Sequence, residues 1–310
     1  MISGHIISPT DLPSSPVGFI GLGNMGFPMA ERLLDAGHGL DVCDIRLSVL
    51  APLVQRGARA MATPRAVADS CRVVVMCLLT TESIADAMLG ADGVLMGTAV
   101  KIVINTSTIG KLEAERLAQA LAQRGIGLVD CPVSGGPPGA RTGTLSVMVS
   151  GPPEQVAEVR GIVDGWGLIT LAGDQPGMAQ VLKLTNNILS AVALAATAEA
   201  FVMGGKGGLN LDVMTTAINA GSGRNSMTLD KIPGSVLDRS FSYGGPIRTL
   251  MKDIELAIEQ GHALGVPMRV CEMAREVFRD AVRAGMSDKD VTEIVRFIEQ
   301  GAGFELPRTR

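Results

Sequence analysis

The feature that most constrains the fold is a glycine-rich turn between a short apolar run and an amphipathic helical pattern, in "VGFIGLGNMGFPMAERLLDAG" (17–37). Its glycines form a G-x-G-x-x-G pattern at Gly21, Gly23 and Gly26. Between a strand and a helix, the first glycine permits a tight turn, the second lets the backbone approach a pyrophosphate, and the third lets helix and strand pack closely. The pyrophosphate then sits at the helix N-terminus, where free N–H groups and the helix dipole favour negative charge. The turn therefore predicts dinucleotide binding.

The first half of the chain alternates strand-like runs with helical patterns. The runs are almost continuously apolar, which is typical of parallel strands that are covered on both faces. Such alternation predicts an α/β, Rossmann-type doubly wound sheet. The predicted strands lie at 17–20, 40–44, 72–78, 101–105 and 127–131, with edge strands at 144–151 and 167–173 around a helix that starts near Pro153.

From about residue 176 the strand patterns stop and helices dominate. A long helix is predicted over about 177–203, ended by the glycine cluster at 204–208. Further helices are predicted at about 210–220, 248–264, 268–284 and 290–299. The sequence thus predicts a dinucleotide-binding domain over 1–175, with an extended leader at 1–15, and an all-helical substrate and oligomerisation domain over 176–310.

Composition narrows the class of protein. A net charge of -4 without a basic stripe argues against a nucleic-acid partner. Five cysteines without a C-x-x-C pair, and three scattered histidines, predict neither a disulfide framework nor a metal site. The N-terminus does not read as a signal peptide, and Lys183 and Glu199 interrupt the most apolar segment before it reaches a span of ~20 residues. We therefore expect a cytoplasmic protein without a membrane crossing.

Asp44 bears on the choice of dinucleotide. It ends the second strand, 18 residues after Gly26, near the spacing expected for a carboxylate on the adenosine ribose. A carboxylate there accepts hydrogen bonds from the ribose hydroxyls and repels a 2′-phosphate, which favours NAD over NADP. Arg46 either pairs with a 2′-phosphate or is a solvated loop charge, so NADP is not excluded.

Two further loops follow strands, at the edge where ligands bind in such sheets. They are "CLLTTES" (77–83) and "NTSTIG" (105–110). The hydroxyls of residues 106–108 either hydrogen-bond the nicotinamide half of the cofactor or cap the helix that begins near 111.

The long helix carries polar residues that burial alone does not explain. Lys183 and Asn187 are four residues apart and share one face, while other faces carry an apolar stripe. A lysine on a buried helix is costly unless its charge meets a partner, and it suits proton transfer. The alternative is a lysine that extends to solvent beside asparagines that cap a break in the helix. In "PVSGG" (132–136), Ser134 and the following glycines either cup a carboxylate or form a flexible loop.

Taken together, "GFIGLGNMG", "PVSGG", "GMAQVLKLTNN" and "MKDIELAIEQGHALGVPMRV" resemble the β-hydroxyacid dehydrogenase family over about residues 16–300. Members include 3-hydroxyisobutyrate dehydrogenase and tartronate semialdehyde reductase. The resemblance implies an NAD(P)-dependent oxidoreductase that interconverts a small 3-hydroxy acid and its semialdehyde or oxo acid. It also implies a small carboxylate-bearing substrate and a homodimer or homotetramer.

The resemblance assigns roles to single residues. Lys183 is the general acid/base, and the substrate is held by Ser134, Gly135, Gly136 and Asn187. The predicted cofactor contacts, from the pattern and the resemblance together, are Gly21, Leu22, Gly23, Asn24, Met25, Gly26, Asp44, Arg46, Leu78, Leu79, Thr108 and Lys252.

Some positions depart from the family pattern, and rival functions stay open. Leu78 and Leu79 stand where many members have a proline. Arg224 either binds a second anionic group of the substrate or is a surface charge. The rivals on the same scaffold are a glyoxylate or succinic semialdehyde reductase, an imine reductase and a 6-phosphogluconate-type enzyme. A non-catalytic NAD-binding scaffold protein is the rival of another class, and Lys183 with Asn187 argues against it.

Overall fold

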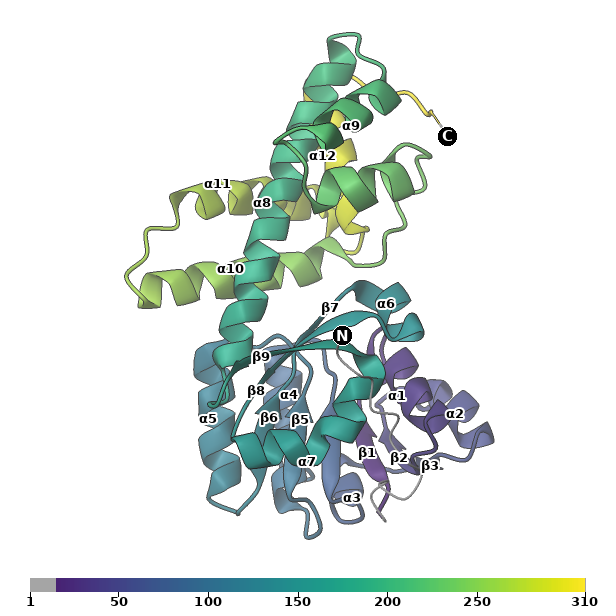
Figure 1. The fold of residues 1–310 in the computed structure, drawn as a ribbon, viewed down its shortest axis with the longest axis vertical. Helices are drawn as coiled ribbons and strands as arrows, with labels where there is room; N and C mark the ends of the chain where they lie inside the picture. The colour runs from purple at the N-terminus through teal and green to yellow at the C-terminus, as the bar shows by residue number, and fades with distance from the viewer. Residues whose placement is uncertain (1–14, 310) are drawn as a thin grey trace, which may run out of the picture. The chain divides into compact units, whose positions relative to one another are not determined.

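The computed structural model describes residues 15–309, which divide into two compact units, one ending at Lys183 and the other beginning at Leu184 (Figure 1). The division falls inside one continuous helix, α8 (Met178–Lys206), so Lys183 is the last residue of the first unit. The predicted domain boundary between 175 and 176 stays a prediction. Of the predicted leader at 1–15, residues 1–14 lie outside the described residues.

The first unit is built on one sheet with the strand order β3-β2-β1-β4-β5-β6-β8-β7, and β9 pairs with β8. From β3 to β6 all neighbours are parallel, whereas β8 is antiparallel to β6 and β7. The predicted Rossmann-type sheet is confirmed. The strands are β1 (Val17–Ile20), β2 (Leu40–Cys43), β3 (Arg59–Ala60), β4 (Val73–Met76), β5 (Ile102–Asn105), β6 (Gly127–Asp130), β7 (Val133–Ser134), β8 (Leu145–Ser150) and β9 (Gly167–Gly173).

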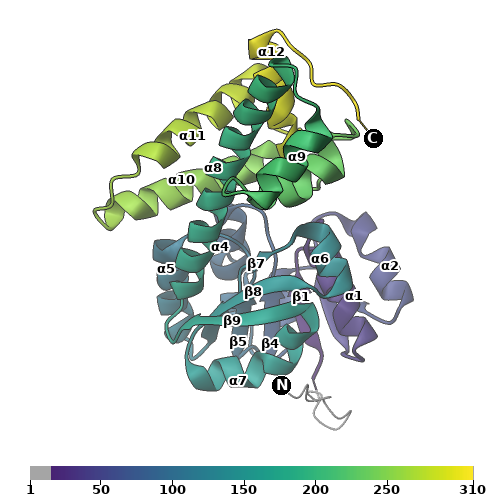
Figure 2. The same cartoon turned by 45° about the horizontal axis from the view of Figure 1, so that its top comes forward.

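Helices cover both faces of the central part of this sheet, which explains why β1, β4 and β5 are buried at every residue. Successive side chains of a strand point to opposite faces. On β4, Val75 belongs to the core on the side of α1, and Met76 to the core on the side of α4 and α5. Figure 2 shows α1 and α2 on one side of the strands and α4 and α5 on the other. The helices are α1 (Gly26–Asp35), α2 (Ala51–Gln55), α3 (Pro64–Ala68), α4 (Thr81–Leu89), α5 (Lys111–Ala122), α6 (Gly136–Thr142) and α7 (Pro153–Val163).

The second unit is helical, as predicted. Its core gathers buried side chains from the remainder of α8 and the helices that follow, including Phe201, Ile254 and Phe278. The elements after α8 are α9 (Leu211–Ala220), a π-helical stretch (Met227–Val236), α10 (Ile247–Ala263), α11 (Arg269–Ala281), a second π-helical stretch (Val282–Met286), a 3₁₀ turn (Val291–Glu293) and α12 (Ile294–Ala302).

The prediction that α8 ends at the glycine cluster 204–208 is confirmed, although the helix runs past the predicted end at 203 and stops at Lys206, inside the cluster. A Cβ on Gly204 would lie 2.4 Å from the sulfur of Met214, and one on Gly205 would lie 2.5 Å from Leu306. These two glycines therefore let Met214 and Leu306 pack closely against the last turn of α8. Gly208, with φ of +89°, follows the helix end in the left-handed region.

The composition of α8 has a packing explanation. By length and hydropathy alone this helix could cross a membrane, with a mean hydropathy of 1.7 over an 18-residue window. Long core helices of soluble proteins meet the same criterion, and 44% of that window is buried. Leu184, Ala191 and Phe201 of α8 belong to the core of the second unit.

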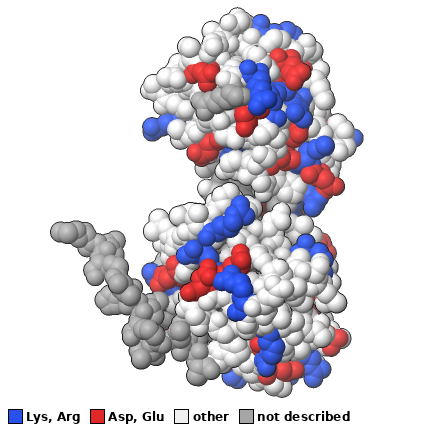
Figure 3. Space-filling model, turned by 90° about the vertical axis from the view of Figure 1, so that its right-hand side faces the viewer, with Lys and Arg blue, Asp and Glu red and all other residues white. Residues whose placement is uncertain are grey.

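Charges of both signs are interspersed on the face drawn in Figure 3. Exposed side chains of opposite charge form ion pairs in the first unit, such as Arg72 with Glu158 at 2.8 Å and Arg160 with Asp164 at 2.8 Å. Exposed pairs of this kind contribute ~0–1 kcal/mol each, so the fold depends on its cores rather than on these pairs.

Candidate active site

The glycine turn after β1 has the geometry that its three glycines predict. Gly21 has φ of +94°, and a Cβ there would lie 2.3 Å from the carbonyl oxygen of Cys77. A Cβ on Gly26 would lie 2.0 Å from the carbonyl oxygen of Gly21, so only glycine lets α1 start this close to the strand. The Cβ position of Gly23 has no heavy atom within 4 Å. The missing side chain thus leaves open space beside the N-terminus of α1, which fits the approach of a pyrophosphate.

Asp44 and Arg46 lie against this turn. Asp44 Oδ2 accepts a hydrogen bond from the N–H of Leu22 at 2.7 Å, and Oδ1 accepts from the N–H of Arg46 at 2.8 Å. The Arg46 guanidinium forms an ion pair with the same carboxylate at 3.2 Å. Burial acts to raise the pKa of Asp44, but the hydrogen bonds and the charge of Arg46 outweigh it and hold the pKa below its ordinary value. Asp44 is therefore charged at neutral pH, and Arg46 is held by it.

The two loops predicted at the strand ends are joined by a hydrogen bond. Ser107 Oγ accepts from the N–H of Leu78 at 2.9 Å, and Thr106 Oγ1 donates to the carbonyl oxygen of Met76 at 2.9 Å. Helix α5 has Gly110 as its N-cap residue, without a side-chain cap. The alternative in which Thr106 or Ser107 caps this helix is wrong, because both hydroxyls bind the end of β4 and the loop after it instead.

Leu78 and Leu79 differ in their surroundings. A Cβ on Gly21 would lie 2.7 Å from Leu78 Cδ2, so Leu78 borders the glycine turn. Leu79 is 49% exposed. Thr108 lies in the neighbouring loop, between Ser107 and the start of α5. Leu78, which stands where many family members have a proline, therefore lies next to the glycine turn.

The predicted substrate turn joins β7 to α6. Ser134 pairs with Ser146 of β8, and the two following glycines have φ values of +125° and +64°. Such values favour glycine, because a Cβ would be strained in this backbone conformation. Ser134 ends β7 and Gly136 begins α6, so the three residues form a turn between a strand and a helix. Both alternatives, a cup for a carboxylate and a flexible loop, stay predictions.

Lys183 is buried, with 7% of its surface exposed. Helix α8 runs without a break through this position and through Asn186 and Asn187. The alternative of a lysine extended into solvent beside a capped helix break is therefore wrong. Gln180, one turn earlier, is completely buried and was not predicted as a site residue. Its only sequence signal is a polar side chain three residues before Lys183.

Two other predicted residues meet on a carboxylate in the second unit. Asn187 donates through Nδ2 to Asp253 Oδ2 at 2.7 Å, and Lys252 Nζ lies 2.8 Å from Asp253 Oδ1. Asp253 is 5% exposed. The structure thus brings Asn187 of α8 and Lys252 of α10 together, and it adds Asp253, which the motif contains but the predicted site omitted. Arg224 lies in the segment between α9 and the π-helical stretch, with an exposed side chain.

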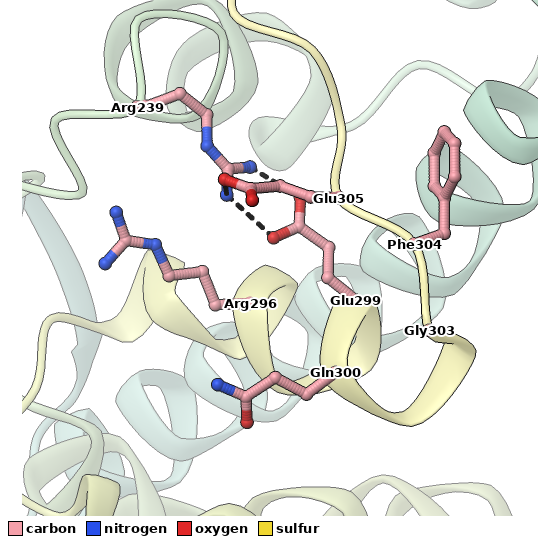
Figure 4. Close-up of a pocket in the computed structure, with 7 residues that line it drawn as sticks. All are labelled: Arg239, Arg296, Glu299, Gln300, Gly303, Phe304 and Glu305. Atoms are coloured by element: carbon pink, nitrogen blue, oxygen red, sulfur yellow. Dashed lines mark hydrogen bonds and ion pairs between the residues drawn. The ribbon is translucent and has the colours of Figure 1, made fainter.

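A surface hollow of about 510 Å³ in the second unit contains none of the predicted site residues. Figure 4 shows the Arg239 guanidinium directed at two carboxylates, at 2.5 Å from Glu299 and 3.0 Å from Glu305. Glu299 also accepts a hydrogen bond from the N–H of Leu306 at 3.0 Å. These contacts fix the C-terminal segment to α12, so the hollow has a structural explanation. Its lining residues are Arg239, Arg296, Glu299, Gln300, Gly303, Phe304 and Glu305.

Comparison with known proteins agrees with this geometry. Residues 16–173 match the family described as the NAD binding domain of 6-phosphogluconate dehydrogenase. Residues 177–298 match the family described as NAD-binding of NADP-dependent 3-hydroxyisobutyrate dehydrogenase. The chain belongs to the 3-hydroxyisobutyrate dehydrogenase family of β-hydroxyacid dehydrogenases. Both matched segments together span the glycine turn, the Ser-Gly-Gly turn, α8 and α10.

Individual relatives of the family support this membership. The chain is 34% identical to a 3-hydroxyisobutyrate dehydrogenase of Pseudomonas aeruginosa, over 90% of this chain and 98% of the relative. It is 31% identical to an NAD-dependent L-serine dehydrogenase of the same organism, over 93% and 99%. A solved 3-hydroxyisobutyrate dehydrogenase of Salmonella typhimurium superposes with a TM-score of 0.82 at 27% identity, over 92% of this chain and all of that one. The chain is therefore an NAD(P)-dependent dehydrogenase that acts on CH–OH groups of hydroxy acids.

Proposed function

We propose that this enzyme interconverts a small 3-hydroxy acid and its semialdehyde or oxo acid, with Lys183 as general acid/base. The observation that carries the proposal is the place of Lys183, which is buried on an unbroken helix three residues after Gln180, in a chain of the hydroxyacid dehydrogenase family. Gln180 is hydrogen-bonded to loop 105–110 at the carboxyl edge of the sheet, where ligands bind in such folds. A lysine beside that edge suits proton exchange with a substrate hydroxyl.

The remaining roles follow from the chemistry of each side chain. Ser134 and the backbone N–H groups of the glycines after it bind the substrate carboxylate. Asn187 orients the substrate hydroxyl one helical turn from Lys183. Lys183 takes the hydroxyl proton during oxidation and returns it during reduction, and its positive charge stabilises the developing alkoxide. When bound, the dinucleotide supplies the acceptor or donor for the hydride of the carbinol carbon.

The substrate class is supported by what two relatives have in common. Their names specify 3-hydroxyisobutyrate and L-serine. Both compounds carry a carboxylate and a hydroxyl on the third carbon, and they differ in the group on the second carbon. We propose that the enzyme recognises the two groups that both compounds share. Lys183 then interacts with the hydroxyl, and the turn at Ser134 binds the carboxylate.

We propose NAD as the preferred cofactor. The support is the Asp44 carboxylate, which is charged and fixed to the glycine turn through Leu22. A negative charge at this place hydrogen-bonds ribose hydroxyls and repels a 2′-phosphate. Arg46 is already paired with Asp44, which leaves less of its charge for a phosphate.

We also propose a homodimer or homotetramer. Two large apolar side chains on α8 support it, because Leu189 is 68% and Met203 73% exposed within one chain. Light scattering coupled to size-exclusion chromatography tests this proposal, and a monomer at micromolar concentration would contradict it.

The central test is turnover of a substrate panel with NAD and with NADP. The panel holds 3-hydroxyisobutyrate, L-serine, glycerate, threonate, 4-hydroxybutyrate and sulfonated analogues, with reverse assays on glyoxylate and semialdehydes. We expect at least one 3-hydroxy acid to exceed 4-hydroxybutyrate in kcat/KM, and NAD to exceed NADP. A higher kcat/KM for 4-hydroxybutyrate or glyoxylate would contradict the proposed substrate class and favour a semialdehyde or glyoxylate reductase.

A further inference from the structure

Three completely buried polar side chains meet where the central strands of the first unit end. They are Asn105 at the end of β5, Asp130 at the end of β6 and Gln180 in the first turn of α8. Asp130 Oδ1 accepts from Gln180 Nε2 at 2.7 Å and from Asn105 Nδ2 at 3.1 Å. One carboxylate oxygen thus joins two strands to a helix that lies 50 residues further along the chain.

The Gln180 amide is fully used, and most of its bonds go to one loop. Its Oε1 accepts from the N–H of Ile109 at 2.9 Å and from that of Gly110 at 3.1 Å. Its Nε2 donates to the carbonyl oxygen of Ser107 at 2.9 Å as well as to Asp130. Gln180 therefore fixes loop 105–110 directly to the first turn of α8.

The same turn of α8 has a second attachment that does not involve the loop. Ser150 Oγ, on β8, accepts from the N–H of Ala179 at 2.9 Å, and Ser150 is also completely buried. Ser150 and Gln180 are thus neighbouring anchors of one helix start. Of these two anchors, Gln180 is the one whose side chain bonds loop 105–110.

Burying the charged carboxylate of Asp130 costs free energy that packing of the side chain does not return. Burial raises the pKa of Asp130 to about 6, while hydrogen bonds from Gln180 and Asn105 oppose the rise. Among the described residues no hydrogen bond reaches Asp130 Oδ2, although this atom is buried. Well-packed apolar residues are often as stabilising as a buried charge, so stability alone gives little reason for a carboxylate here. A fixed geometry is what such a network provides.

We propose that Gln180 and Asp130 are positioning residues that hold Lys183 in register with loop 105–110. Lys183 follows Gln180 by three residues, so a shift of the first turn of α8 moves both together. The inference rests on the proposed role of Lys183 and on the contact of loop 105–110 with the nicotinamide half that the sequence predicts at Thr108. A misplacement of about 1 Å at a reacting group lowers turnover by up to ~100-fold.

The first test compares Gln180→Met with Ser150→Ala. Methionine fills the volume of glutamine without its hydrogen bonds, and Ser150→Ala removes the neighbouring anchor. We expect Gln180→Met to lower kcat by roughly 10- to 100-fold, with the KM for substrate and the Kd for NADH within about 3-fold. Ser150→Ala should lower Tm with kcat within about 3-fold of wild type. Equal kcat for Gln180→Met and wild type would overturn the proposal, as would equal losses of kcat in both variants.

A reversed pair tests the link between the two side chains. Gln180→Glu places two carboxylates 2.7 Å apart in a buried site, and we expect it to lose more kcat than Gln180→Met. In the double variant Asp130→Asn with Gln180→Glu, the amide introduced on β6 can donate to the carboxylate introduced on α8. We expect this double variant to regain at least about 5-fold in kcat over Gln180→Glu. A double variant no better than the single one would contradict the proposed pairing.

Failure of the proposed function is recognised separately. If wild type turns over no hydroxy acid, the proposed function fails, and amide hydrogen exchange then decides the positioning role. In Gln180→Met we expect faster exchange in 106–110 and 178–183 together, whereas Ser150→Ala affects the helix start without the loop. Unchanged exchange in the loop of Gln180→Met overturns the inference whatever the enzyme acts on.

Discussion

Lys183 and Lys231 are equally buried, at 7% exposed each, but they lie in different units and have different surroundings. Lys183 is in α8, three residues after Gln180, which is bonded to loop 105–110. Lys231 is in the π-helical stretch Met227–Val236, and its Nζ lies 4.6 Å from the centroid of the Tyr243 ring. The comparison shows that burial of a lysine is not by itself a sign of catalysis.

The surroundings of Lys231 explain its burial without a reaction. Burial lowers the pKa of Lys231, and the charges of Asp230 and Asp290 act in the opposite direction. An aromatic face and acidic residues of its own unit thus compensate the cation. Lys183 differs, because its neighbours along the helix connect to the carboxyl edge of the sheet. Position relative to that edge distinguishes the two lysines.

The largest expected effect comes from removing each ammonium group in turn. Lys183→Ala should lower kcat by about 100-fold or more, about 3 kcal/mol in the barrier, because proton transfer and alkoxide stabilisation are both lost. Lys231→Met is the matched control and should keep kcat within about 3-fold. Steady-state kinetics and NADH fluorescence titration measure turnover and cofactor affinity. Comparable kcat losses in the two variants would remove the distinction between the lysines.

Asp130, the buried acid beside Gln180 in the first unit, should make the free energy of unfolding depend on pH. The ordinary pKa of 3.8 describes Asp130 in the unfolded chain, and the folded value is about 6. The folded state therefore binds the proton more tightly, and wild type loses stability as pH rises from about 4 to above 6, by roughly 3 kcal/mol. Asp130→Asn lacks this loss.

Denaturant unfolding of wild type and Asp130→Asn between about pH 4.5 and pH 7.5 measures the difference. We expect the free energy of unfolding of the variant to rise relative to wild type across this range. Parallel curves would show that the buried carboxyl of Asp130 does not titrate there, and the electrostatic cost assigned to it would be wrong.

A charge that is fixed at the cofactor turn should show a smaller effect. Asp44→Ser removes a charged acceptor that lies against the turn, and such hydrogen bonds contribute ~1.5–3 kcal/mol. We expect kcat/KM with NAD to fall roughly 10- to 100-fold while kcat/KM with NADP rises or holds. Asp35→Asn, an exposed acid of the same unit, is the control. An unchanged ratio of NAD to NADP would contradict the role proposed for Asp44.

Much of the fold was predictable because burial on both faces leaves a strong local pattern. The continuous apolar runs located β1, β2, β4, β5 and β6, and the glycine spacing predicted how Gly21, Gly23 and Gly26 differ. The two-residue strands β3 and β7 were missed, because two residues carry no periodicity. Gly204 and Gly205 were predicted to follow the helix but lie inside it, because they make room for Met214 and Leu306, which come later in the sequence.

The missing site residues have a common cause, which is pairing over long sequence distances. Gln180 meets Asp130 across 50 residues, and Asn187 meets Asp253 across 66. No local pattern encodes which carboxylate an amide will reach. A polar residue in an otherwise apolar helix predicts that a partner exists, and only the fold identifies the partner.

The smallest expected effect concerns stability at Lys231. The folded pKa lies below 10.5, so the unfolded chain binds the proton more tightly and wild type gains stability as pH rises towards 10.5. Lys231→Met lacks this gain and also loses the contact with Tyr243, which contributes ~0.5–1 kcal/mol. Near pH 7 the relief of a buried charge and the lost contact oppose each other, so the variant should stay within about 1 kcal/mol of wild type.

Denaturant unfolding at about pH 7 and about pH 10 checks this expectation, with Tyr243→Leu and the double variant completing a cycle. The difference in the free energy of unfolding should move in favour of wild type at the higher pH. The cycle should return a coupling of ~0.5–1 kcal/mol at pH 7 and less at pH 10, where the ammonium is partly lost. A coupling that does not change with pH would mean that Tyr243 holds the lysine by packing of its methylene chain, and the compensation of its charge would then come from Asp230 and Asp290 alone.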